Sequence, residues 1–146
     1  CLDKWVADSG LVALMGDAAH PFLPTSTQGG SQAIEDAATI ALCLSKAGKN
    51  NIPLALHSYF AFRYKRAKGA QQIGITQREK WHNLHDKETK EMVGSIDTSK
   101  GLFDSHILWN HDAEREVEDN WNEISQQTTE RLALTSPLRP SIGVKL

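Results

Sequence analysis

One stretch of sequence, residues 11–37, decides the expected fold of this chain; it reads LVALMGDAAHPFLPTSTQGGSQAIEDA. Its first five residues, Leu11 to Met15, are apolar without a break and end at Gly16. An apolar run bounded by a turn residue is typical of a strand that is buried on both faces, as in a parallel sheet. We therefore predict an α/β fold in which residues 11–15 form one strand of a parallel sheet, followed by helices.

The residues that follow this strand predict a ligand site. Ligands of open α/β sheets lie beyond the carboxyl ends of the strands, where Asp17 is placed. Gly29 and Gly30 then open an apolar helix, whose start offers unpaired N–H groups and roughly half a positive charge. A carboxylate and a cluster of N–H donors suit a ligand with sugar-like hydroxyls and an electron-rich carbonyl. The ribityl chain and the pyrimidine edge of a flavin match that description.

A longer pattern surrounds these residues: GDAAHP at 16–21, Pro24, QGG at 28–30 and QAIEDA at 32–37. In spacing and identity it resembles the second FAD motif of the single-component (group A) FAD-dependent monooxygenases. That family includes salicylate and p-hydroxybenzoate hydroxylases and many fungal FAD-binding monooxygenases of secondary metabolism. The chain departs from the pattern at Thr27, where the family often has Gly or Ala. The resemblance implies a Rossmann-like FAD-binding domain.

The resemblance also implies which residues hold the cofactor. Asp17 would bond the ribityl chain, and the helix start at residues 29–31 would face the N1–C2=O edge of the flavin. Pro24 is expected to shape the pocket near the flavin ring, and His20 to position the loop through a hydrogen bond. The predicted cofactor-binding residues are Gly16, Asp17, Ala18, Pro24, Gln28, Gly29, Gly30 and Ser31. No catalytic residue and no metal ligand is identified.

Composition excludes several classes of protein. The 146 residues fit one domain, with 40% hydrophobic and 23% charged residues, as in ordinary globular proteins. A net charge of −2 favours neither nucleic acid nor a membrane surface as a partner. Cys1 and Cys43 are too few for a disulfide framework or a zinc site, and Cys43 is expected to be a small buried hydrophobe. We expect a cytoplasmic protein.

The sequence lacks the G-x-G-x-x-G turn that opens a dinucleotide-binding fold. It also lacks the strand-rich stretch that would cover the substrate in such hydroxylases. We therefore expect a fragment, the C-terminal part of a family member, whose N-terminal FAD- and substrate-binding part is missing. Residues 1–85 would complete the FAD-binding domain, and residues 86–146 would form a helical or irregular tail packed on it.

Three helices are expected after the strand. The first, from about residue 31 to residue 47, should be largely buried because apolar residues wrap most of its circumference. The second begins near Pro53 and continues to about His85, although Gly69 and Gly74 weaken it. The third, residues 112–126, is acidic and amphipathic. Its apolar face comprises Val117, Trp121 and Ile124.

Other clusters favour structural interpretations. Arg63 and Arg66 follow a Y-x-x-x-R-x-x-R pattern that resembles the family's, and we expect them to be paired structural guanidinium groups. His82 and His85 share a helix face but lack a third metal ligand, so a polar helix end is expected. Two apolar islands within residues 102–109 are expected to anchor the tail.

The resemblance implies an activity for the whole enzyme. It would use FAD, with NAD(P)H as co-substrate, to hydroxylate or epoxidise an aromatic or polyketide-like small molecule. Two alternatives stay open. One is a truncated, inactive remnant or interaction module, which would expose large apolar surfaces because its strand edges are unpaired. The other is a related FAD-dependent epoxidase or reductase.

Overall fold

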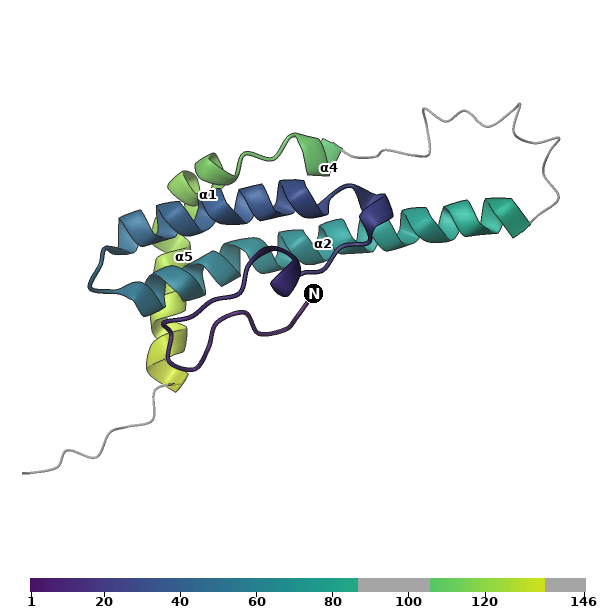
Figure 1. The fold of residues 1–146 in the computed structure, drawn as a ribbon. Coiled ribbons are helices and arrows are strands. Elements are labelled where there is room, and N and C mark those ends of the chain that lie inside the picture. The colour runs from purple at the N-terminus through teal and green to yellow at the C-terminus, as the bar shows by residue number, and fades with distance from the viewer. Residues whose placement is uncertain (87–105, 136–146) are drawn as a thin grey trace, which may run out of the picture.

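A computed structural model describes residues 1–86 and 106–135, and this part of the chain is built of helices (Figure 1). In chain order these are the 3₁₀ turns η1 (Gly16–Ala18) and η2 (Pro24–Ser26), then α1 (Gly29–Ala47), α2 (Ile52–Asp86), α4 (His106–Trp109) and α5 (Ala113–Thr135). α1 and α2 lie side by side and antiparallel, and α5 crosses them near the loop that joins them. The N-terminal segment runs along α2 in an irregular path.

The structure does not form the strand predicted at residues 11–15. In the described ranges the only β-pairing is one isolated antiparallel bridge, between Val6 and Ala13. Leu11 and Val12 are 63% and 60% exposed instead of buried on both faces. A strand requires a neighbouring backbone along its length, and here only the short segment around Val6 supplies one. The described part of the chain is thus mostly helical, and the predicted strand of a parallel sheet is not confirmed there.

α1 buries a polar stripe where the sequence predicted burial of apolar residues. Its buried residues are Gln32, Asp36, Thr39 and Cys43, whose spacing places them on one face of the helix. Ile34, by contrast, is 73% exposed. The prediction of a helix buried around most of its circumference is therefore wrong.

α2 confirms the second predicted helix, which continues through both glycines. Gly74 serves close packing, because a Cβ atom there would lie 3.0 Å from Cβ of Ser26 in η2. Tertiary packing therefore compensates for the low helix propensity of glycine at this position. The buried face of α2 comprises Ala55, Leu56, Ser58, Tyr59, Phe62, Arg63, Ala67 and Ala70.

Trp5 is a packing residue of the core. Its indole is almost fully buried, and its ring centroid lies 5.1 Å from that of His20 and 5.8 Å from that of Tyr59. The indole N–H donates to the Leu2 carbonyl at 2.9 Å, so the buried polar atom is satisfied. Cys43 is also fully buried, which confirms its predicted role.

α5 confirms the third predicted helix and extends it to Thr135. The Asp112 carboxylate accepts a hydrogen bond from the Arg115 amide at 3.0 Å, which caps the start of the helix. The predicted apolar face packs on the core, with Val117 fully buried. Of the predicted tail anchors, Leu108 is buried but Trp109 is 62% exposed.

Some expectations lie outside the described residues or remain predictions. The side chains of His82 and His85 and the apolar pair at 102–103 lie outside the described part. The predicted division of the chain at residues 85 and 86 falls at the end of α2 and stays a prediction. Among the helices that the structure describes, none has the length and apolar character needed to cross a membrane.

Candidate functional site

A cavity of about 510 Å³ lies between η1, the loop that contains η2, and the start of α1. This volume falls in the range typical of small-molecule sites, roughly 300–1,000 Å³. The cavity is lined by Asp17, Phe22, Leu23, Pro24, Thr27, Gly29, Gly30 and Ala33. The structure thus brings together half of the predicted cofactor-binding residues, namely Asp17, Pro24, Gly29 and Gly30.

Asp17 and the first residue of α1 approach each other closely in this cavity. A Cβ atom on Gly29 would lie 3.4 Å from Oδ1 of Asp17 and 3.5 Å from Cβ of Phe22. The glycine therefore keeps open the space between the carboxylate and the helix start. Because the Asp17 side chain is exposed and an ionised carboxylate only accepts hydrogen bonds, it is suited to bind hydroxyl groups.

The start of α1 presents backbone N–H groups next to this carboxylate. The first hydrogen bond of the helix runs from the Gln32 amide to the Gln28 carbonyl, at 3.0 Å. The amides of residues 29–31 therefore have no carbonyl partner within the helix. Together with the roughly half positive charge of a helix start, they suit an anion or a carbonyl oxygen.

The remaining predicted residues lie beside the cavity and not in its lining. Gly16 is buried with a φ of 56°, a left-handed conformation that favours glycine. Ala18 is exposed, and Gln28 is buried behind the helix start. The Ser31 hydroxyl donates to the Gln28 carbonyl at 2.9 Å, so it is engaged within its own helix.

Four lining residues were absent from the predicted set: Phe22, Leu23, Thr27 and Ala33. Phe22 and Leu23 belong to the loop between Pro21 and Pro24, and Ala33 follows Gly29 by one helical turn. The sequence spacing therefore indicates that all three lie near the cavity. Thr27 adopts a φ of 54°, which is uncommon for a residue with a branched side chain. The departure from the family's Gly or Ala therefore falls on a strained position.

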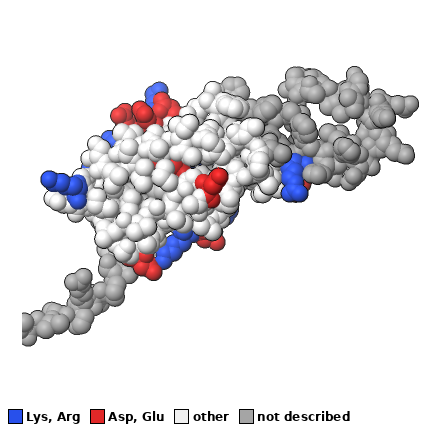
Figure 2. Space-filling view, viewed as in Figure 1, with Lys and Arg blue, Asp and Glu red and all other residues white. Residues whose placement is uncertain are grey.

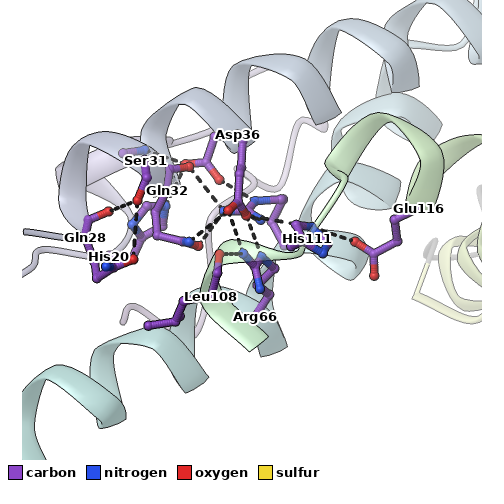
Figure 3. Close-up of polar contacts among 12 residues, drawn as sticks. His20, Gln28, Ser31, Gln32, Asp36, Arg66, Leu108, His111 and Glu116 are labelled. Carbon is purple, nitrogen blue, oxygen red and sulfur yellow. Dashed lines mark hydrogen bonds and ion pairs between the residues drawn. The ribbon is translucent and has the colours of Figure 1, made fainter. Parts of the chain in front are cut away.

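The buried carboxylate of Asp36 in α1 holds the loop before the cavity in place (Figure 3). Its Oδ2 accepts a hydrogen bond from the Gly16 amide at 2.8 Å and another from His20 Nε2 at 2.6 Å. Its Oδ1 accepts from Arg63 Nε of α2 at 2.8 Å. This geometry confirms that His20 positions the loop through a hydrogen bond. No local pattern indicates Asp36 as the partner, because it lies 16 residues from His20 in the sequence.

Arg63 and Arg66 are paired structural groups, as predicted. Arg63 is fully buried, and its Nη2 donates to the carbonyl of Gln32 at 3.1 Å and to the side-chain oxygen of Gln32 at 2.8 Å. Both arginines form ion pairs with Glu35. Arg66 Nη2 also donates to the Leu108 carbonyl at 3.1 Å, which ties α4 to α2.

The acidic residues of this network remain ionised despite their burial. Burial alone would raise the pKa of Asp36, but hydrogen bonds from His20, Arg63 and the Gly16 amide outweigh it and lower the pKa below its ordinary value. Burial opposes ionisation of Glu35 in the same way, and the two arginines again lower its pKa. The network is therefore charge-assisted, which strengthens its hydrogen bonds.

α2 supports the second half of the loop directly. The Gln71 side-chain amide donates to the Pro21 carbonyl at 2.6 Å. Three residues further along the helix, Gly74 lets Ser26 lie against the helix backbone. In the described part of the chain, no group of three or more His, Cys, Asp or Glu side chains is arranged to hold a metal ion.

The chain is similar to known proteins in both sequence and structure. Residues 4–73 match the family model described as FAD binding domain. An FAD-dependent monooxygenase of Hypoxylon pulicicidum, nodY2, is 60% identical over 70 residues, which are 48% of this chain and 15% of that protein. The FAD-dependent monooxygenase notI' of Aspergillus versicolor is 47% identical over 115 residues, 76% of this chain and 24% of that protein.

Solved structures share the fold. CtdE, crystallised in complex with FAD and a substrate, matches with a TM-score of 0.75 and 31% identity over 88% of this chain and 30% of that one. The crystal structure of FqzB matches with a TM-score of 0.70 and 33% identity, over 88% and 29% of the two chains. The chain thus spans less than a third of the length of each of these proteins.

Proposed function

We propose that this chain forms part of an FAD-dependent monooxygenase, because it is similar to fungal enzymes of that name and its residues 4–73 match the family model described as FAD binding domain. The enzyme would use NAD(P)H and would oxygenate an aromatic or polyketide-like small molecule. The observation that carries the proposal is the cavity that Asp17 shares with the start of α1. The comparisons do not favour an inactive remnant, because the relatives of this chain are named as monooxygenases.

The residues of the cavity fit a flavin. Asp17 would accept hydrogen bonds from the ribityl hydroxyls, and the amides of Gly29 and Gly30 would donate to the pyrimidine carbonyl. The space that Gly29 keeps open lets the cofactor lie against the backbone. When bound, FAD supplies the redox chemistry, while the protein binds and orients it. Preorganised amides at the helix start would stabilise negative charge on an oxygen placed there.

An exposed apolar surface agrees with a place in a larger enzyme. Leu11, Val12, Met15 and Ile34 are all exposed. Figure 2 shows that the face along which the N-terminal segment runs carries few charged side chains, most of them at its borders. Exposed apolar side chains are typical of surfaces that a partner covers. We propose that the rest of a longer polypeptide, comparable to the relatives in length, covers this surface.

The test is FAD binding by the full-length protein, measured by quenching of flavin fluorescence. Asp17→Asn removes the charge, so binding should weaken about tenfold, the effect of losing about 1.4 kcal/mol of a charge-assisted hydrogen bond. Stability without cofactor should stay unchanged because the side chain is exposed. Asp119→Asn, an equally exposed change on α5, is the matched control. A wild-type protein that neither binds FAD nor oxidises NAD(P)H contradicts the proposal.

A further inference from the structure

Asp36 connects the candidate cofactor site to the helical core without lining the cavity. Its carboxylate is fully buried, and its two oxygens bond in different directions. Oδ2 accepts from the Gly16 amide at 2.8 Å and from His20 Nε2 at 2.6 Å. Oδ1 accepts from Arg63 Nε at 2.8 Å. One side chain of α1 thus joins a loop to a second helix.

The two loop contacts of Asp36 enclose Asp17. Gly16 directly precedes it, and His20 follows it by three residues. Within this short segment, the amides of Ala19 and His20 each donate to the Gly16 carbonyl at 2.9 Å, forming a tight turn. A turn held at both ends by one carboxylate has little freedom to move. The backbone position of Asp17 is therefore set from a point outside the cavity.

Arg63 fixes the orientation of the Asp36 carboxylate in turn. Its planar guanidinium donates to Asp36 through Nε and, through Nη2, to both oxygens of Gln32. Such a fork restricts its partners more strongly than a lysine would. Asp36 and Gln32 lie on the buried face of α1, one turn apart. The turn that carries Asp17 is thereby attached to the α1–α2 pair.

We propose that Asp36 is a positioning residue for the flavin site, which acts by holding Asp17 at the ribityl-binding position. This inference rests on the function proposed above. Without the Asp36 charge, Asp17 keeps its own chemistry but loses its fixed place opposite the start of α1. The loss of FAD affinity should then come from the displaced Asp17 alone.

A double-mutant cycle in the full-length protein tests this coupling, with FAD dissociation constants as the readout. Asp36→Asn alone should weaken binding about tenfold, because the amide cannot serve both the Gly16 amide and Arg63 as well as a carboxylate does. In an Asp17→Asn background, the same change should weaken binding no further. Additive losses, or no loss from Asp36→Asn in the wild-type background, would overturn the inference.

Two further variants separate positioning from general stability. Thr39→Val alters a buried residue on the same face of α1 that is not bonded to the 16–20 segment, so it should leave FAD affinity unchanged. Equal weakening by Thr39→Val and Asp36→Asn would contradict the proposal. His20→Phe removes one loop contact but keeps the ion pair between Asp36 and Arg63. This variant replaces Asp36→Asn in the cycle if Asp36→Asn does not fold. It should show the same lack of additivity with Asp17→Asn, and additive losses would again overturn the proposal.

The same cycle distinguishes the two proposals. If Asp17→Asn binds FAD as tightly as the wild type does, the proposed role of the cavity is wrong. If Asp17→Asn weakens binding and Asp36→Asn does not, only the positioning role is wrong. The ¹⁵N chemical shift of the Gly16 amide gives a readout that needs no cofactor. It should move in Asp36→Asn and stay in place in Thr39→Val.

Discussion

Asp17 and Gly29 lie so close together that a Cβ atom on the glycine would be 3.4 Å from Oδ1 of the carboxylate. The first residue belongs to η1 and the second opens α1, so the contact joins two elements across the cavity. An added methyl group is tolerated sterically but occupies the space where a ligand would meet both groups. A substitution of Gly29 should therefore affect ligand binding without affecting folding.

Gly29→Ala should weaken FAD binding several-fold while leaving the free energy of unfolding equal or higher. Alanine favours a helix over glycine by about 0.5–1 kcal/mol, although the first turn reduces this gain. Calorimetry without cofactor and fluorescence titration with FAD measure the two effects. Gly69→Ala is the matched control, because Gly69 is exposed on α2 and nothing surrounds its Cβ position. Unchanged FAD affinity in Gly29→Ala would mean that the ligand does not pass between Asp17 and the helix start.

Arg63→Met should lower the free energy of unfolding by about 3–5 kcal/mol, because it leaves the buried carboxylate of Asp36 without its guanidinium partner. Urea denaturation followed by circular dichroism measures the change. Lys65→Met, an exposed change on the same helix, should stay within about 0.5 kcal/mol of the wild type. A similarly small effect of Arg63→Met would show that the buried ion pair contributes little.

Acid should destabilise the protein through Glu35 and Asp36. Both pKa values are lowered in the folded state from ordinary values of 4.5 and 3.8, so folding favours the ionised forms. The two carboxylates contribute fully to the free energy of unfolding when the pH is above their ordinary pKa values. This contribution is lost as the pH falls toward their lower pKa values in the folded state. Urea denaturation at a series of pH values should show this loss of stability in the acidic range. The free energy of unfolding should fall less steeply with decreasing pH in Asp36→Asn than in the wild type. Equal slopes in the two proteins would show that Asp36 does not contribute to the acid sensitivity.

The two cysteines should differ in reactivity. Burial raises the pKa of the Cys43 thiol to about 12, so it stays protonated and inaccessible in the folded protein. Cys1 is half-buried and should react first with Ellman's reagent. Cys43 should react only after denaturant is added, and Cys43→Ser identifies the slow phase. Rapid reaction of both thiols under native conditions would contradict this burial.

Local sequence determined where α1 ends and where α5 begins. Gly48 follows α1 with a φ of 74°, which only glycine adopts readily, and Asp112 caps α5 with its own carboxylate. The spacing of Asp17 from Gly29 also predicted that a carboxylate and a helix start would meet in one cavity. These features depend on neighbouring residues and on short-range geometry, so the sequence alone carries them.

Only the tertiary structure decided which backbone segments pair and which buried polar side chains bond one another. The apolar run at residues 11–15 had the composition of a strand, but a strand depends on a partner backbone that no local pattern supplies. The burial of the polar face of α1 follows from Arg63, which approaches from α2 and satisfies Gln32 and Asp36. Asp36 holds the turn that contains Asp17 because packing brings its carboxylate to Gly16 and His20. A buried charge is stable only where distant residues neutralise it, and their positions follow from packing.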